Sequence, residues 1–563
     1  MRIVTLHSDF IEFEAKKPAI RAPEEIAEAK RRFEDCLVVF AAVEKADEAG
    51  VDDVVAQAAA SIKDVMAQVK VNKVVVYPWV HLTSSPSSLD CARDALQKLE
   101  AALAKDFEAA HAPFGWYKAF NISVKGHPLA ELSRQFTPKG AAVPVKFDVE
   151  HELHNISKVV LSREKLKDND HRIIGQNLDL FSFYNVAPGM VFWHPKGLVI
   201  VNELINFWRE EHRKAGYQEI STPQVMADVL WKVSGHWDHY KDNIFTTEYD
   251  KRSFAVKPMN CPGGIMVYKS RSRSYKELPL RMSELGIVHR LELSGVLAGL
   301  FRVVKFTQDD AHLYCTEDQL EDELVGVIAL VDKFYKAFGF EYHMELSTMP
   351  KKAMGSKEQW DKAEAALKAA LVARGANYKI NEGDGAFYGP KIDFHIKDSL
   401  GRTWQLATLQ LDFQMPERFQ LEYVGEDGKN HRPVMLHRTV YGSMERFIGI
   451  LLEHTNGNLA PWLAPVQVKV VSFSDKNDKA AEKYAKTLFD AGYRVETDVR
   501  PGTVEAKVRD AEMQKIPYII VIGDKEEAAG TLAVRRHGEK GVKFGVIPKA
   551  FESQLAKEVA SRA

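Results

Sequence analysis

The sequence reads HRLEL at residues 289–293 and FRVVKF at residues 301–306, and we expect these two strings to form the strands of a β-hairpin. Alternate residues of a strand face the same side, so Arg290 and Glu292 should lie on one face, with Arg302 and Phe306 on the returning strand. That face then presents cations, an anion and an aromatic ring. Such a surface suits a nucleotide, because arginine pairs with phosphate oxygens and an aromatic ring stacks on a base.

A third string and an upstream unit complete the pattern. YGSMERFIG at residues 441–449 would bring Arg446 against the other face of the base. Residues 198–215 have apolar side chains at helical spacing, Gly216 ends that helix, and a short strand, 217–220, leads to Pro223. Each arginine taken alone would more often be an ordinary surface or ion-pair residue, so only the combination predicts a nucleotide site.

Length and composition are those of a multidomain globular protein. The chain has 563 residues, enough for three or four domains. The hydrophobic share of 45% and the charged share of 27% exclude collagen-like, low-complexity and wholly disordered proteins. The 76 lysine and arginine residues are balanced by 78 aspartate and glutamate residues, so the chain has no overall positive charge that would indicate binding to nucleic acid. A local basic surface stays open.

Cysteine spacing and apolar runs predict a cytoplasmic, soluble protein without membrane association. Cys36, Cys91, Cys261 and Cys315 lie far apart without CxxC spacing, so a disulfide framework is not expected. The longest apolar runs have about eight residues, short of the roughly 20 that span a bilayer. The first residues carry acidic side chains where a signal peptide has its apolar stretch.

Periodicity divides the chain into four predicted segments. Residues 1–137 alternate strand-like and helical stretches, as in a compact α/β or α+β domain. Residues 138–169 lose this periodicity and carry prolines, which suits a linker. Residues 170–464 contain the strings of the predicted nucleotide site. Residues 465–563 alternate strands with helices, which predicts a separate α/β domain.

Longer strings resemble one enzyme family. The strings of the predicted nucleotide site, at 289–306 and 441–449, resemble motifs 2 and 3 of class II aminoacyl-tRNA synthetases. The helix and strand at 198–220, with Pro223, resemble motif 1. The strings that resemble threonyl-tRNA synthetases are SGHWDHYKDNIF at 234–245, KPMNCPGG at 257–264, FTQDDAHLYCT at 306–316, FYGPKIDF at 387–394 and MLHRTVYGSMERFIG at 435–449. The resemblance covers nearly the whole chain. It implies a catalytic antiparallel sheet flanked by helices, a homodimer formed through motif 1, and charging of tRNA(Thr) with L-threonine at the expense of ATP with Mg²⁺.

The resemblance assigns roles to individual residues. It implies that Arg290, Arg302 and Arg446 act on the phosphates, with Arg290 bridging to the threonine carboxylate, and that His236 takes a proton as threonine moves to the ribose. Further expected ATP contacts are Glu292, Phe306, Gln405 and Lys391. Further expected pocket residues for threonine are Asp310, Gln308, Met259, Tyr388 and Ser443.

The resemblance also implies one zinc ion per chain, held by Cys261, His312 and His437. The spacing of these residues carries no zinc signature of its own. Three protein ligands leave zinc an open face, as catalytic sites do. A plain pocket cannot strongly reject valine, which is isosteric with threonine, whereas a metal bound by both amino group and hydroxyl can. Asp310 would reinforce this choice by accepting from the hydroxyl.

Rejection of serine requires a second selection step, because serine keeps the hydroxyl of threonine and lacks only one methyl group, which is worth about 1–3 kcal/mol. The strings HSDF at 7–10, YPWVHLTSS at 77–85, APFGWYKAF at 112–120 and HPLAELSR at 127–134 resemble the archaeal-type editing domain, which is related to D-aminoacyl-tRNA deacylases. The residues that this implies for hydrolysis of seryl-tRNA are His81, Tyr117, Lys118 and Glu131.

The C-terminal segment resembles the class II anticodon-binding domain, which implies that Glu526 and Arg535 read anticodon bases. The loop at 500–510 lacks the family's usual sequence, so the tRNA determinants stay open. Two alternatives remain at this point. A regulatory RNA-binding paralogue without catalysis would usually lose the motif arginines, and another class II ligase, prolyl or seryl, is opposed by TQDDAH and Cys261.

Overall fold

The computed structural model describes residues 1–20, 22–26, 28–138, 149, 153, 156–159, 161 and 166–562. The chain divides into two compact units, residues 1–151 and 152–563, and each is described by itself. The predicted linker, 138–169, lies largely outside the described residues. No helix within the described part of the chain is long and apolar enough to cross a membrane.

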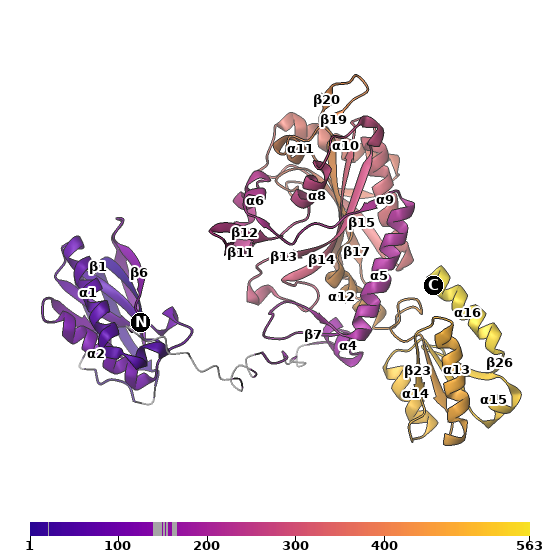
Figure 1. Ribbon diagram of the computed structural model, residues 1–563, viewed down its shortest axis with the longest axis horizontal. Helices are drawn as coiled ribbons and strands as arrows, with labels where there is room; N and C mark the ends of the chain where they lie inside the picture. Colours follow the sequence, from indigo (N-terminus) through magenta and orange to yellow (C-terminus); the bar gives the residue numbers. More distant parts are fainter. Residues whose placement is uncertain are drawn as a thin grey trace. The chain divides into compact units, whose positions relative to one another are not determined.

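The first unit is one mixed sheet with two helices packed against it (Figure 1). The strand order is β4-β3-β2-β1-β5, and β6 also pairs with β1. The elements are β1 (Arg2–Pro18), β2 (Lys30–Ala42), α1 (Val51–Val69), β3 (Lys73–Pro78), α2 (Leu89–Leu103), β4 (Glu108–His111), β5 (Trp116–Val124) and β6 (Glu131–Gln135). Helix α1 forms because its apolar residues recur on one face and pack into the core with Leu37 and Val74.

The second unit is built on an eight-stranded sheet whose order is β16-β15-β17-β18-β21-β14-β13-β9. Its strands are β9 (Gln218–Glu219), β13 (Leu280–His289), β14 (Lys305–Cys315), β15 (Glu341–Ser347), β16 (Tyr378–Asn381), β17 (Lys391–Lys397), β18 (Thr403–Asp412) and β21 (Val434–Ser443). All neighbours are antiparallel except β13 with β9 and β15 with β16. The prediction of a mainly antiparallel sheet is therefore confirmed.

Helices cover one face of this sheet and form the main hydrophobic core with it (Figure 1). They are α5 (Pro195–Lys214), α9 (Leu320–Ala337), α10 (Lys357–Ala373) and α12 (Met444–Thr455). The helix expected at 198–215 is α5, Gly216 follows it with φ of +76°, and β9 is the short strand before Pro223. Helix α12 follows β21 directly, and Ser443 caps it by accepting a hydrogen bond from the Arg446 N–H (3.2 Å).

Shorter elements complete this part of the chain, and some of them pack into the main core through residues such as Ile174 and Phe181. They are α4 (His171–Asn177), β7 (Phe181–Ser182), β8 (Phe192–Trp193), β10 (Val225–Ala227), α6 (Val229–Val233), α7 (His236–Tyr240), β11 (Thr246–Tyr249), β12 (Arg252–Val256), α8 (Cys261–Tyr268), α11 (Gln414–Arg418), β19 (Tyr423–Val424) and β20 (Asn430–His431). Strands β10, β12 and β11 form a small antiparallel sheet.

The C-terminal part has a five-stranded sheet in the order β23-β22-β24-β25-β26. Its elements are β22 (Val468–Ser472), α13 (Asp478–Asp490), β23 (Val495–Asp498), α14 (Val504–Met513), β24 (Tyr518–Ile522), α15 (Asp524–Ala529), β25 (Leu532–Arg536), β26 (Lys543–Val546) and α16 (Pro548–Ser561). The first three strands in the chain are parallel, as the alternation of strands and helices predicts, and β25 and β26 are antiparallel. Arg494 ties this part to α5 through Glu203 (2.7 Å).

The predicted hairpin is confirmed, but its strands are shorter than expected. Strand β13 ends at His289 and β14 begins at Lys305, so Arg290, Glu292 and Arg302 lie in the connecting loop. The expectation that they alternate on strands is wrong. The ladder opens because the Val304 N–H donates to the carbonyl oxygen of Gly189 (2.7 Å) rather than to the facing strand. We call residues 290–304 the motif 2 loop.

Candidate active site

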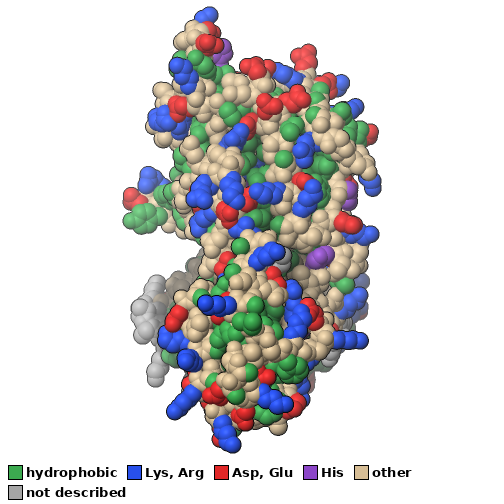
Figure 2. Space-filling model, turned by 90° about the vertical axis from the view of Figure 1, so that its right-hand side faces the viewer, with side chains coloured by type: hydrophobic (Ala, Val, Ile, Leu, Met, Phe, Trp, Pro, Cys, Tyr) green, Lys and Arg blue, Asp and Glu red, His purple; other side chains and the backbone are tan. Residues whose placement is uncertain are grey.

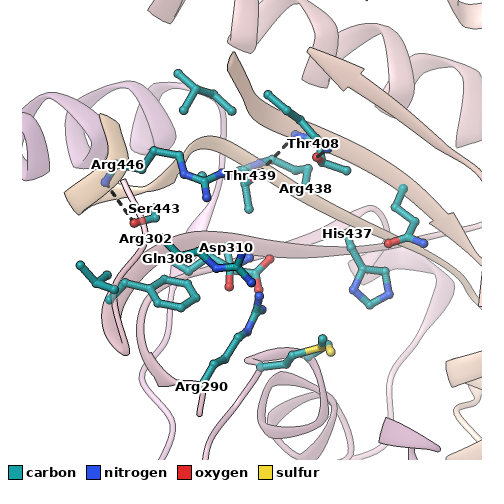
Figure 3. Close-up of a pocket in the computed structure, with 18 of the residues that line it drawn as sticks. Arg290, Arg302, Gln308, Asp310, Thr408, His437, Arg438, Thr439, Ser443 and Arg446 are labelled. Atoms are coloured by element: carbon teal, nitrogen blue, oxygen red, sulfur yellow. Dashed lines mark hydrogen bonds between the residues drawn. The ribbon is translucent and has the colours of Figure 1, made fainter. Parts of the chain in front are cut away.

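One cavity of about 440 Å³ opens over strands β14, β18 and β21 of the large sheet. Thirteen of the expected site residues line it: Met259, Cys261, Arg290, Glu292, Arg302, Phe306, Gln308, Asp310, Tyr388, Gln405, His437, Ser443 and Arg446. Figure 3 shows three arginines, Arg290, Arg302 and Arg446, toward one end of this cavity and His437 toward the other. The cavity therefore has a cationic end and an end beside the candidate metal ligands.

The cationic end holds arginines whose charges are only partly compensated. Arg290 donates from Nε to the Pro258 carbonyl oxygen (3.2 Å), and its guanidinium lies 5.1 Å from the centre of the Phe306 ring. Arg446 donates from Nε to the Phe301 carbonyl oxygen (2.9 Å). Burial lowers the pKa of both side chains, and for Arg446 the neighbouring Arg302 and Arg290 lower it further. A bound polyanion would relieve this repulsion.

Glu292 is engaged with another expected site residue. Its carboxylate accepts a hydrogen bond from Arg302 Nε (2.9 Å), and the Arg302 side chain is otherwise largely exposed. An adenine amino group could use the remaining acceptor sites of this carboxylate, which has about four in all. The structure thus places the pair on one wall of the cavity and joins the two residues to each other.

The candidate metal centre is a buried cluster of Cys261, His312 and His437, whose ligand atoms all lie within 4.8 Å of one another. Cys261 begins α8, His312 lies on β14, and His437 lies opposite His312 on β21. The nitrogen His437 Nε2 is hydrogen-bonded to Asp412 Oδ2 (2.7 Å), which leaves Nδ1 for a ligand. The register of two neighbouring strands and one helix start therefore assembles residues that lie far apart in the sequence.

The chemistry of this cluster fits zinc. His312 Nε2 is buried and has no hydrogen-bond partner, and burial lowers the pKa of the imidazole, which favours the neutral form that binds metals. Burial raises the pKa of the Cys261 thiol, and a divalent cation reverses this preference because it binds the thiolate. One sulfur and two nitrogens, with a carboxylate behind one imidazole, form a donor set typical of zinc sites with an open position.

Asp310 lies between the two ends of the cavity. Its Oδ2 accepts a hydrogen bond from Asn260 Nδ2 (3.2 Å), and Oδ1 lies 3.8 Å from His312 Nε2. Burial raises the pKa of the Asp310 carboxyl to about 6, against the opposing charge of His437. An acceptor at this position can bind a substrate hydroxyl that also faces the metal cluster.

Three expected residues do not line the cavity themselves. His312 lies behind it in the metal cluster, and His236 is fully buried, with Nδ1 hydrogen-bonded to Ser234 Oγ (2.7 Å) and Nε2 lying 3.8 Å from Cys261 Sγ. Lys391 Nζ donates to Asp393 Oδ2 (2.6 Å), whose other oxygen accepts from Gln405 (2.5 Å). Lys391 and Gln405 therefore meet at one carboxylate, and only Gln405 reaches the cavity.

Several polar residues of the site were missed at the sequence level. The missed lining residues with polar side chains are Thr408, Gln410, Arg438 and Thr439. Thr408 and Gln410 share one face of β18, so strand alternation could have found them once that strand was placed beside β21. Asn260 and Asp412 were missed as well, because their importance depends on Asp310 and His437, which lie far away in the sequence.

In the first unit, two of the four expected editing residues are joined through aromatic rings. The Lys118 ammonium lies 5.1 Å from the Tyr77 ring, Tyr77 contacts Trp79 (5.8 Å between ring centres), and Trp79 contacts His81 (5.7 Å). Lys118 Nζ donates to the carbonyl oxygens of Pro113 (2.7 Å) and Trp116 (3.2 Å). Burial lowers the pKa of Lys118 to about 8.

The other two expected editing residues lie on neighbouring strands. Tyr117 adjoins Lys118 on β5 and is 58% exposed, and Glu131 begins β6 at an exposed position opposite Leu6 of β1. In the C-terminal part, Glu526 accepts a hydrogen bond from the Gly523 N–H (3.2 Å), and Arg535 is ion-paired with Glu512 (2.5 Å). Both candidate anticodon residues are half-buried and already have local partners.

Comparisons with known proteins match all three parts of the chain. Family models match residues 1–136 (Archaea-specific editing domain of threonyl-tRNA synthetase), 245–455 (tRNA synthetase class II core domain of the G, H, P, S and T enzymes) and 467–558 (anticodon binding domain). The crystal structure of the RNA binding domain of threonyl-tRNA synthetase from Cryptosporidium parvum Iowa II is 40% identical, with a TM-score of 0.67, over 69% of this chain and 98% of that one. The chain belongs to the threonyl-tRNA synthetase family.

Curated members of the threonyl-tRNA synthetase family share a long region of similar sequence with the chain. The threonine–tRNA ligase of Carboxydothermus hydrogenoformans is 59% identical over 375 residues, which cover 67% of this chain and 59% of that relative. The threonine–tRNA ligase of Caldanaerobacter subterraneus subsp. tengcongensis is 54% identical over 425 residues, which cover 75% of this chain and 65% of that relative. The chain thus spans less than two thirds of the length of these relatives. The expected fold class, with an editing domain, a class II core and an anticodon-binding domain, is confirmed.

Proposed function

We propose that the chain ligates L-threonine to tRNA(Thr) through a threonyl-adenylate formed from ATP with Mg²⁺, and that its first unit hydrolyses mischarged seryl-tRNA. The observation that carries the proposal is the single cavity with three arginines at one end and the Cys261, His312 and His437 cluster beside the other. The arginine end suits a triphosphate, and the other end suits an amino acid with a hydroxyl. Family membership supports the same reaction.

For adenylate formation, the arginines bind and orient ATP. Arg290 lies against Phe306, so it can contact the α-phosphate and the threonine carboxylate while the ring stacks on adenine. Arg302 and Arg446 compensate the negative charge that grows as pyrophosphate leaves. We assign the threonine contacts to Asp310 and the residues around it, and the proton transfer to the ribose to His236.

We propose that Cys261, His312 and His437 hold one zinc ion per chain. Bound there, zinc would supply a Lewis acid within reach of both the amino group and the hydroxyl of threonine. Valine has no hydroxyl, so it would make only one of these two contacts. Asp412 orients His437, and Asn260 holds the Asp310 carboxylate so that it can accept from the substrate hydroxyl. These contacts of the chain's own residues distinguish threonine from its isostere.

We propose that the first unit, bounded near residue 137, edits seryl-tRNA with His81, Tyr117, Lys118 and Glu131. Support comes from the match of residues 1–136 to the editing domain and from the contacts that join His81 to Lys118. The lysine is half-buried beside two backbone carbonyl oxygens, so its charge can act in a site with restricted water. The segment from 138 to 169 would serve as the linker to the catalytic part, 170–464.

We propose tRNA(Thr) as the macromolecular partner, with residues 465–563 as the anticodon-binding domain and Glu526 and Arg535 at its base contacts. Figure 2 shows a row of lysine and arginine side chains across the face in view, which suits a phosphate backbone. We further propose a homodimer through α5 and β9, supported by the exposed Leu198 on α5. A cytoplasmic setting is proposed because Cys36, Cys91, Cys261 and Cys315 are all free thiols, as reducing conditions would keep them.

The direct test is amino acid-dependent exchange of pyrophosphate into ATP by the purified full chain, across all amino acids, with zinc measured on the same sample. We expect exchange with threonine, weaker exchange with serine, none with valine or proline, and about one zinc per chain. Exchange with another amino acid alone would contradict the threonine assignment. A zinc-containing protein that exchanges with no amino acid would favour the regulatory paralogue.

A further inference from the structure

A buried histidine outside the cavity joins three separate segments of the catalytic part. His171 begins α4 and its Nδ1 is hydrogen-bonded to Glu453 Oε1 on α12 (2.6 Å). Its Nε2 accepts a hydrogen bond from the N–H of Leu300 in the motif 2 loop (2.9 Å). The imidazole is 1% exposed, so both bonds are shielded from water. One ring therefore connects α4, the motif 2 loop and α12.

The two hydrogen bonds define the protonation of the ring. A backbone N–H can only donate, so His171 Nε2 must carry the lone pair and Nδ1 must carry the proton. That proton is donated to Glu453, whose other oxygen accepts from Arg402 (2.5 Å), and Arg402 also donates to Asp398 (2.7 Å). The imidazole is thus a neutral connector with a fixed direction, supported by a carboxylate that is itself held in place.

This cluster is not arranged to hold a cation, although Asp170, His171 and Glu453 lie close enough together for one. Asp170 accepts from Arg172 through both oxygens (2.9 and 2.8 Å), and Glu453 accepts from Arg402. The arginines already compensate both carboxylates, and both histidine nitrogens are engaged. The cluster therefore serves hydrogen bonding within the chain.

Two glycines make room for the loop at this place. At Gly299, which has φ of +54°, a Cβ would lie 2.3 Å from His171 Nε2. At Gly449 on α12, a Cβ would meet the Phe301 ring at 3.0 Å and Leu300 Cβ at 3.1 Å. The Phe301 ring in turn packs on the imidazole (4.2 Å between centres) and on Trp404 (4.5 Å). The turn at 299–301 therefore packs closely against His171, Trp404 and Gly449 of α12.

The next contacts lead into the cavity. Phe301 follows Leu300, and its carbonyl oxygen accepts the hydrogen bond from Arg446 Nε. Arg302 follows Phe301 and lines the same cavity. A displacement of the Leu300 N–H would move both the acceptor that aims Arg446 and the backbone that carries Arg302.

We propose that His171 is a positioning residue for the ATP-binding end of the cavity. By accepting from the Leu300 N–H, it fixes the turn of the motif 2 loop and so aims Arg446 and Arg302 at the phosphates, while Glu453 fixes the imidazole. This deepens the proposed function and rests on it for the identity of the nucleotide. It requires no contact between His171 and any substrate.

The test compares three substitutions in the full chain. His171→Gln places an amide oxygen near the position of Nε2 and can keep the bond to Leu300, whereas His171→Asn places its amide near Nδ1 and can keep only the bond to Glu453. His171→Ala keeps neither. His194→Gln is the matched control, because His194 also makes two side-chain hydrogen bonds, to Ser182 (2.8 Å) and Asp179 (2.7 Å), outside the cavity.

We expect the KM for ATP in pyrophosphate exchange to rise about tenfold in His171→Asn and His171→Ala, the worth of one buried hydrogen bond. It should rise far less in His171→Gln and stay within twofold in His194→Gln. The KM for threonine should stay near the wild-type value in all four. A merely structural role would instead lower the active fraction and leave both KM values unchanged.

The Kd for ATP, measured by titration calorimetry without any amino acid, separates this inference from the proposed function. An enzyme that activates no amino acid would contradict the proposed function, while the Kd series would still decide the role of His171. Equal affinity for ATP in wild type, His171→Asn and His171→Gln would overturn the positioning role. If His171→Ala does not fold, the comparison of glutamine with asparagine decides alone.

Discussion

At the scale of single residues, the cavity combines groups whose burial works against their ionised forms. Arg290 and Arg446 have a lowered pKa, Asp310 has a raised one, and the Cys261 thiol is fully buried beside two imidazoles. Such opposing shifts gather where a ligand completes the charge balance. Removal of one of these groups should therefore change ligand binding more than it changes folding.

Cys261→Ala should remove the zinc and reduce threonine-dependent exchange to background, because two imidazoles alone do not complete the donor set. Cys261 packs in a smaller core cluster with Met282 and Tyr314, apart from the main core between the sheet and its helices, so circular dichroism should show the sheet retained. The matched control is Cys36→Ala, a buried cysteine in the first unit. Zinc content and exchange rate are measured on both proteins, and a fully active, zinc-free Cys261→Ala protein would contradict the metal assignment.

Arg302→Ala and Arg446→Ala should each lower the rate of exchange about 100-fold even with saturating threonine, because they compensate charge that develops as pyrophosphate leaves. Arg500→Ala is the control, since Arg500 is an ion-paired residue of the C-terminal part. Steady-state exchange at saturating threonine is the measurement. Rates within a factor of two of wild type would show that these arginines do not act on the phosphates.

Lys118 should give the first unit a pH dependence of defined sign. Burial lowers its pKa from 10.5 to about 8, so between these values the unfolded chain holds a proton that the folded unit has released. Stability should therefore rise with pH over that interval. Limited proteolysis of residues 1–138 in the full chain, followed from pH 8 to 10, should show growing protection in wild type and a flatter course in Lys118→Met. Parallel courses would contradict the lowered pKa.

At the scale of elements, β14 and β21 determine the site. Their register places His312 opposite His437, and a register shift between Gln308 and Asp310 leaves Asp309 in the interior. Its carboxylate accepts hydrogen bonds from the N–H groups of Val440 (2.9 Å), Tyr441 (3.0 Å) and Gly442 (2.8 Å). One side chain thus satisfies the backbone where β21 turns toward Ser443 and Arg446.

Asp309→Asn should destabilise this turn, because an amide offers one acceptor oxygen and turns an N–H group toward backbone donors. We expect the melting temperature of the full chain to fall on the order of 5 °C, and exchange to fall with it. Asp490→Asn, at an exposed ion pair with Lys486 on α13, is the control and should change little. A melting temperature equal to wild type would contradict this role of Asp309.

Many of the helices and strands were predictable from the sequence, whereas the ends of the hairpin and several site residues depend on partners far away in the chain. Helix α5, the hairpin β13–β14 and the parallel strands of the C-terminal part follow from local periodicity. The ends of the hairpin do not, because the hydrogen bond from Val304 to Gly189 forms only in the folded chain. Asn260, Asp412 and His171 escaped prediction for the same reason, since their partners lie 50, 25 and 282 residues away.

At the scale of the whole molecule, the proposal assigns two separate selections of threonine to one chain. In this proposal, the cavity of the second unit excludes valine through the metal cluster and Asp310, but it excludes serine only by one methyl group. The first unit has its own family match and forms a compact unit by itself, as a separate second selection requires. A second selection that acts after charging would remove the serine that the first admits.

The most direct measurement is the steady-state ratio of seryl- to threonyl-tRNA when the full chain is given tRNA(Thr), ATP and both amino acids. Wild type should accumulate threonyl-tRNA almost alone, and Lys118→Met should accumulate seryl-tRNA as well while its threonine-dependent exchange stays unchanged, because the two selections use different sites. Lys125→Met, a lysine of the same unit paired with Asp35, serves as the control and should match wild type. Equally clean threonyl-tRNA from wild type and Lys118→Met would contradict the assignment of editing to this site, and no threonyl-tRNA from wild type would contradict the account as a whole.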